Sequence, residues 1–69
     1  MNRIERYVYI NELGRRKSLT VNWDRQKENK YFCLLRDLKT GEQCGSIYKT
    51  EEEIINFLAH YGVKILKRG

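Results

Sequence analysis

Hydrophobic and polar residues alternate in the first third of the chain with the two-residue period of β-strands. Residues 4–13 (IERYVYINEL) and 18–23 (SLTVNW) both show this alternation and are rich in residue types that strands favour. We expect a hairpin around a turn at 14–17 (GRRK), with Val8 opposite Trp23 and Ile10 opposite Val21. This register gathers the aliphatic residues and the tryptophan on one face: Ile4, Val8, Ile10, Leu19, Val21 and Trp23. The opposite, exposed face would carry Tyr7, Tyr9, Asn11, Thr20 and Asn22.

A second pair of strands is expected in the middle of the chain. Residues 24–29 (DRQKEN) predict a polar loop, 30–38 (KYFCLLRDL) a third strand, and 42–49 (EQCGSIYK) a strand that returns. The KTG at 39–41 is typical of a three-residue hairpin loop with Gly41 in the left-handed conformation. This loop pairs Arg36 with Cys44 and Cys33 with Ile47. Both faces of the two strands are apolar, so the pattern leaves open which face belongs to the core.

The sequence after residue 49 predicts one helix. Thr50 is a favourable N-cap, and Glu53 completes the pattern of a capping box. Gly62 is the expected end of the helix, and Val63 is placed for the apolar contact that often follows such a glycine. The apolar residues of this segment form one stripe that must pack on the sheet: Ile54, Ile55, Phe57, Leu58 and Tyr61.

These elements predict a small α+β fold in a single domain, residues 1–69. An antiparallel sheet of about four strands would carry one helix on one face, in the order β-β-β-β-α, with residues 64–67 as a candidate fifth, short strand. The face without the helix would be exposed to solvent or would bind a partner. We expect a function to reside on that face.

The composition of the chain indicates the cellular compartment in which the protein works. No apolar run approaches the ~20 residues that cross a bilayer, and the N-terminus lacks the apolar core of a signal peptide. We therefore expect a cytoplasmic protein with no membrane partner. Cys33 and Cys44 are expected to be unpaired, because the predicted hairpin register points them to opposite faces. With His60 as the main further ligand candidate, the chain does not suggest a structural metal site.

The sequence suggests no catalytic site and no cofactor. His60 is the single histidine and lies late in the helix, where its partial positive charge suits the helix dipole. The three glutamates at 51–53 are explained by capping and by the same dipole. Gly41 and Gly45 lack the spacing of a phosphate-binding loop. We therefore expect a protein that is not an enzyme.

A formal net charge of +5 favours anionic partners, although it also serves solubility. Cations on exposed loops suit phosphate contacts, and aromatic and amide side chains on an open sheet suit bases. Ordinary solvated lysines and β-forming tyrosines would give the same pattern. The candidate residues for binding nucleic acid are Arg15, Arg16, Lys17, Tyr7, Tyr9, Asn11, Arg25 and Lys27.

Residues 29–62 (NKYFCLLRDLKTGEQCGSIYKTEEEIINFLAHYG) contain a strand, a D-x-x-T-G turn, a second strand, and a helix opened by Thr and acidic residues. In this order the chain is similar to small DNA-binding domains, built from a three-stranded sheet and a helix, at the N-termini of some tyrosine integrases. The resemblance covers about half of the chain, which adds an N-terminal pair of strands. It implies an α+β fold and DNA as a partner.

The two apolar faces of the middle strands indicate a protein partner, because a second apolar face must be covered. The sequence therefore favours a small regulatory module, with a phage or a mobile element as a fitting source, that binds another protein as a subunit, adaptor or inhibitor. Binding to its own copy as a homodimer would cover the face equally well. DNA binding through the basic hairpin loops and the exposed sheet face is the alternative. The candidate protein interface is Phe32, Leu34, Arg36 and Tyr48.

Overall fold

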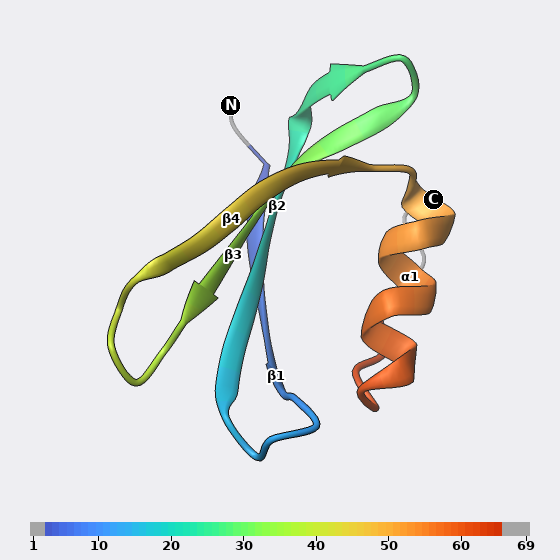
Figure 1. The fold of residues 1–69 in the computed structure, drawn as a ribbon. Helices are drawn as coiled ribbons and strands as arrows, with labels where there is room; N and C mark the ends of the chain where they lie inside the picture. Colours follow the sequence, from blue (N-terminus) through green and yellow to red (C-terminus); the bar gives the residue numbers. More distant parts are fainter. Residues whose placement is uncertain (1–2, 66–69) are drawn as a thin grey trace.

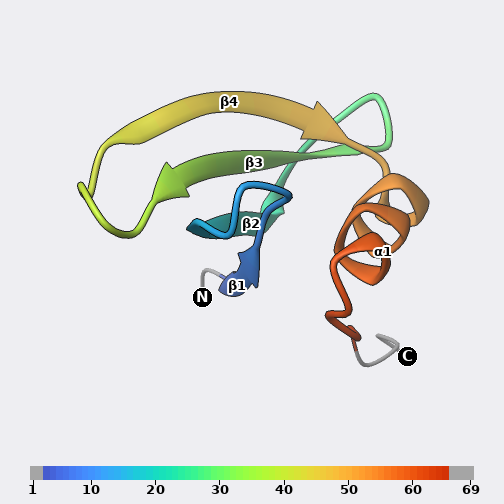
Figure 2. The same cartoon turned by 60° about the horizontal axis from the view of Figure 1, so that its bottom comes forward.

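The computed structural model describes residues 3–65. Four strands form one antiparallel sheet in sequence order, followed by one helix: β1 (Ile4–Ile10), β2 (Arg16–Lys27), β3 (Lys30–Asp37), β4 (Gln43–Lys49) and α1 (Glu51–His60). The sheet is strongly twisted, and α1 lies along one side of it (Figures 1 and 2). The predicted α+β fold is confirmed. Residues 64 and 65 are not in a strand, and the rest of the candidate fifth strand lies outside the described residues.

The β1–β2 hairpin has a different register from the one that the alternation predicts. Val8 lies opposite Ser18, five residues before the expected Trp23, and Tyr9 lies opposite Lys17. Because the register differs by an odd number of residues, every side chain of β1 points to the face opposite the expected one, relative to β2. Tyr7 and Tyr9 therefore share a face with Leu19, Val21 and Trp23. The three aliphatic residues of β1 point to the other face and are exposed, at 53%, 48% and 59% for Ile4, Val8 and Ile10.

The turn chemistry of Asn11 explains this register. The Asn11 side-chain oxygen accepts hydrogen bonds from the backbone N–H groups of Leu13 and Arg15, both at 3.0 Å. The backbone N–H of Asn11 donates to the Arg15 carbonyl at 2.9 Å, and Gly14 supplies a φ of +76°. An asparagine that bonds its own downstream backbone favours a turn over a strand. The turn therefore occupies 11–15, and the expected turn at 14–17 and sheet position of Asn11 are wrong.

The polar segment 24–29 is not a loop, as the sequence predicts, but mostly strand. β2 continues to Lys27, and only Glu28 and Asn29 form the turn, with φ of 52° and 65°. Two successive residues with positive φ suit the right-handed twist of a tight hairpin, and Asn tolerates this conformation well. Pairing with β3 is interrupted by a register shift between Asn22 and Gln26.

The β3–β4 hairpin follows the prediction over most of its length. Cys33 pairs with Ile47 as expected, and Gly41 has the expected left-handed conformation, with φ of +76°. Arg36, however, pairs with Gln43 instead of Cys44, because the register shifts after Leu35.

The core lies between α1 and one face of the sheet. The face of β3 that carries Cys33 belongs to this core, and the face that carries Phe32 and Leu34 points away from it. The sequence leaves this choice open. The buried core residues are Tyr9, Leu19, Val21, Trp23, Cys33, Ile54 and Leu58. Burial raises the pKa of the Cys33 thiol to about 11. Both Cys33 and Cys44 are free, as predicted.

Both ends of α1 are capped as the sequence predicts. The Thr50 hydroxyl accepts from the Glu53 N–H at 3.1 Å, and the Glu53 carboxylate accepts from the Thr50 N–H at 2.9 Å. These hydrogen bonds hold the pKa of Glu53 below its ordinary value. At the other end, Gly62 has a φ of +78°, and the Val63 N–H donates to the Leu58 carbonyl at 2.8 Å. This is the pairing of a Schellman motif. Within the described residues, no helix is long and apolar enough to span a membrane.

Replacing Thr50 by alanine is expected to lower the free energy of unfolding by about 1 kcal/mol, because the Glu53 N–H loses its acceptor. Thr50→Ser keeps the hydroxyl and is the matched control. Urea denaturation followed by circular dichroism measures both variants. Equal stability of Thr50→Ala and the parent would contradict the capping box.

Candidate nucleic-acid interface

The face of the sheet opposite α1 is open. Its positions lie in rows that cross the strands, so that Ile4, Asn22, Phe32 and Tyr48 form one row and Arg6, Thr20, Leu34 and Ser46 the next. A third row contains Val8, Ser18, Arg36 and Gln43, of which Ser18 is fully buried, and Ile10 and Arg16 complete the face. We call these residues the open face.

The open face carries cations and no carboxylate. Arg6, Arg16 and Arg36 are all exposed, and no acidic residue occupies any position of its rows. Glu5 and Asp37, the carboxylates at paired positions of the strands, point to the side of α1. Asp24 lies where the pairing of β2 is interrupted, and its carboxylate accepts a hydrogen bond from the Arg3 N–H at 2.6 Å. At the paired positions, the pleat of the sheet therefore separates the acidic residues from the arginines of the open face.

An aromatic pair and a fourth guanidinium extend the open face. The rings of Phe32 and Tyr48 pack edge to face with centroids 5.4 Å apart. The Arg25 guanidinium lies over the Phe32 ring, with its carbon 4.1 Å from the centroid, in a cation–π contact. The predicted protein-interface residues Phe32, Leu34, Arg36 and Tyr48 thus do share one face.

The tyrosines expected on the exposed face lie on the opposite one. Tyr9 is only 7% exposed, and its ring centroid is 5.4 Å from that of Phe57 and 4.6 Å from that of Tyr61. Tyr7 is half-buried against the same core. Tyr9 therefore presents no free ring face for base stacking, and Tyr7 is on the side of α1. The aromatic surface of the open face is Phe32 and Tyr48, which the sequence offered for a protein interface.

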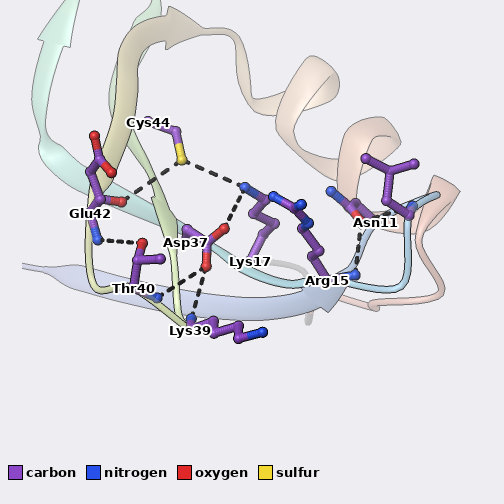
Figure 3. Close-up of polar contacts among 9 residues, drawn as sticks. Asn11, Arg15, Lys17, Asp37, Lys39, Thr40, Glu42 and Cys44 are labelled. Atoms are coloured by element: carbon purple, nitrogen blue, oxygen red, sulfur yellow. Dashed lines mark hydrogen bonds and ion pairs between the residues drawn. The ribbon is translucent and has the colours of Figure 1, made fainter.

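The two hairpin tips at one end of the sheet enclose a second basic feature. An open hollow of about 630 Å³ lies between the β1–β2 turn and the β3–β4 loop. We call it the tip hollow; it is lined by Gly14, Arg15, Arg16, Asp37, Leu38, Lys39 and Thr40. Figure 3 shows Arg15 from one tip, and Lys39 and Thr40 from the other, on different sides of Asp37.

Asp37 holds the β3–β4 loop in place and forms an ion pair with Lys17. One carboxylate oxygen is 3.0 Å from the Lys17 ammonium, and the other accepts from the backbone N–H groups of Lys39 at 2.8 Å and Thr40 at 3.3 Å (Figure 3). The Lys17 contact and the Lys39 N–H hold the pKa of Asp37 below its ordinary value. Lys17 is therefore engaged in an ion pair within the fold. The cations that line the tip hollow are Arg15, Arg16 and Lys39.

The remaining basic candidate, Lys27, lies elsewhere. It pairs with Lys30 beside the β2–β3 turn. This turn lies at the end of the sheet opposite the β1–β2 turn and the β3–β4 loop (Figure 1). The structure thus brings Arg15 and Arg16 together but leaves Lys27 apart from them. Arg6 was missed by the sequence reading. Recognising the Asn11 turn would have moved the β1 register and placed Arg6 beside Thr20.

Comparisons with family models, with curated proteins and with solved structures found no match to this chain. Between residues 3 and 65, no three His, Cys, Asp or Glu side chains gather in a way that could hold a metal ion. His60 packs its ring against Tyr61 with centroids 4.8 Å apart.

Proposed function

We propose that this protein is a non-enzymatic DNA-binding module whose open face contacts the DNA. The observation that carries the proposal is the charge of that face: three exposed arginines and no carboxylate in its rows, with Arg25 at its margin. The sequence favoured a protein partner because both faces of the middle strands are apolar. In the structure one of these faces packs in the core, and the other carries arginines beside the Phe32–Tyr48 pair, with Glu5 and Asp37 on the opposite side.

The residue types of the open face suit a nucleic acid. Guanidinium groups form planar, paired hydrogen bonds with phosphates and with the major-groove edge of guanine. The Asn22 side-chain oxygen accepts from the backbone N–H groups of Asp24 and Arg25, at 3.0 and 3.2 Å, which leaves its amide N–H groups as donors. Thr20 adds a hydroxyl in the neighbouring row.

The resemblance to the DNA-binding domains of tyrosine integrases supports the same proposal. The elements on which it rests are β3, β4 and α1, in the order seen in those domains. The D-x-x-T-G segment forms the β3–β4 loop, in which Asp37 accepts from Lys39 and Thr40 and Gly41 has a positive φ. Thr50 and Glu53 form the capping box that opens α1.

A fluorescence-anisotropy titration with mixed-sequence duplex and single-stranded DNA tests the proposal. We expect duplex binding that weakens at least tenfold between about 50 and 200 mM salt, because bound phosphates release counterions. Arg6→Ala/Arg36→Ala is expected to weaken binding and to reduce the salt slope by about 2. The control Lys49→Ala/Lys64→Ala removes the same amount of charge, and Lys49 lies over the Phe57 ring on the side of α1, away from the open face. No duplex binding by the parent at 50 mM salt, or equal losses in both variants, would contradict the proposal.

Binding to a protein is the second candidate, and the exposed aliphatic residues of β1 favour it. Ile4, Val8 and Ile10 are exposed on β1, which is an edge strand of the sheet. An edge strand with exposed apolar side chains favours association with another protein. Such binding, including self-association, would depend little on salt. Sedimentation at several protein concentrations distinguishes the two candidates, because a dimer through β1 would dissociate on dilution and would be lost in Ile4→Ser/Ile10→Ser.

A further inference from the structure

The tip hollow is held together by backbone contacts between the two hairpins. The Leu38 N–H donates to the Arg16 carbonyl at 3.1 Å, which joins the second tip to the first. The Gly41 N–H closes the second tip on the Asp37 carbonyl at 2.8 Å, and the Arg36 guanidinium donates to the Gly41 carbonyl at 2.8 Å. The groups that line the hollow therefore come from two turns whose relative positions are fixed by the sheet.

The basic side chains that line the tip hollow are not engaged by other groups of the described chain. Within residues 3–65, no hydrogen bond or ion pair occupies the charged ends of Arg15, Arg16 and Lys39. Asp37 is the one carboxylate of the lining, and both of its oxygens are already engaged by Lys17 and by backbone N–H groups. The cations of the hollow thus keep their full attraction for an external anion.

A hydroxyl adds a hydrogen-bond donor to these charges. The Thr40 side-chain oxygen accepts from the Glu42 N–H at 3.2 Å, which leaves the hydroxyl hydrogen free to donate. The lining thus offers hydrogen-bond donors from two guanidinium groups, one ammonium group and one hydroxyl. A tetrahedral phosphate offers oxygens in several directions and suits such a set better than a planar carboxylate.

We propose that the tip hollow is a phosphate-binding site and that it takes a backbone phosphate of the DNA lying on the open face. The second part rests on the proposed function. Arg16 connects the two surfaces, because it lines the hollow and also belongs to the open face opposite Ile10. Arg36 connects them again through its hydrogen bond to the second tip. A duplex on the open face would run past the hollow, which would fix its position without reading sequence.

The test compares a hollow variant with the variants of the open face. Arg15→Ala/Lys39→Ala is expected to weaken duplex binding roughly tenfold at 50 mM salt, equally for all sequences, and to reduce the salt slope by about 2. Lys49→Ala/Lys64→Ala again controls for charge. Backbone-amide NMR spectra of the parent with inorganic phosphate are expected to show shifts at Gly14, Lys39 and Thr40 that the hollow variant loses.

The outcomes separate the two proposals. If the hollow variant binds duplex like the control while Arg6→Ala/Arg36→Ala does not, the hollow holds no DNA phosphate and the proposed function stands. If the parent binds no duplex, the DNA proposal fails. Phosphate-induced shifts at Gly14 and Thr40 would then keep the hollow as a site for a small phosphate ester. Absence of those shifts, together with unchanged duplex binding in the hollow variant, overturns the site altogether.

Discussion

Replacing Tyr9 by alanine is expected to lower the free energy of unfolding by about 3 kcal/mol, whereas replacing its neighbour Ile10 is expected to cost about 1 kcal/mol or less. Tyr9 is 7% exposed and contacts the rings of Phe57 and Tyr61, so its removal leaves a cavity under α1. Ile10 is 59% exposed on the open face, and its loss removes little buried area. A chain of this length is expected to have a total stability of about 3–10 kcal/mol, so the first loss is a large share.

Chemical denaturation of both variants measures the difference directly. The two residues are adjacent in one strand, so local strand propensity affects both and burial separates them. The register that the alternation predicts reverses the order, with Ile10 in the core and Tyr9 exposed. A larger loss for Ile10→Ala would therefore restore that register and remove the assignment of the open face.

Ile54→Ala is expected to cost about 3 kcal/mol, and Ile55→Ala to be close to neutral. Ile54 is fully buried and connects α1 to the sheet, and the cavity left by the lost methyl groups cannot be filled by a short chain with a small core. Ile55 is 37% exposed, and alanine has the higher helix propensity, which offsets the smaller loss of contact.

Thermal and urea unfolding of the two helix variants provide the measurement. We expect Ile54→Ala to be partly unfolded near 37 °C and Ile55→Ala to follow the parent. Equal losses at the two positions would mean that α1 is rotated on the sheet relative to the structure. The core would then be formed by a different stripe of the helix.

The helix and the third hairpin were predictable because their signals are local. The Thr50 and Glu53 capping box, the Gly62 end and the left-handed Gly41 each depend on a few neighbouring residues, and each is present in the structure. The predicted pairing of Cys33 with Ile47 is also present, although the loop begins one residue earlier than expected and the register shift after Leu35 compensates for it. Gly62 and Gly41 require a backbone conformation that other residues rarely adopt, so their positions marked the ends of elements.

The first hairpin was not predictable from its alternation. β1 is apolar on both faces, with Ile4, Val8 and Ile10 on one and Tyr7 and Tyr9 on the other. Hydrophobicity alone favours the aliphatic face for the core. The turn at Asn11 sets the other register, in which the Tyr9 ring packs against the rings of Phe57 and Tyr61. A turn displaced by a few residues changes the face of every side chain in the strand.

The open face and the tip hollow depend on the same tertiary choices. Arg6, Arg16 and Arg36 come from three strands, and only the register of those strands brings them together on a face without carboxylates. Lys39 joins Arg15 only because two hairpin tips meet.

The sequence by itself determined the order of the elements, the capped helix and the excess of positive charge. These are properties of short segments, whose hydrogen bonds and propensities are local. The tertiary structure decided which face of the sheet is buried, because this depends on how far-apart turns set the register and on which side chains α1 can cover. Since the pleat then places each charge on one side or the other, the same decision separated the arginines from the carboxylates.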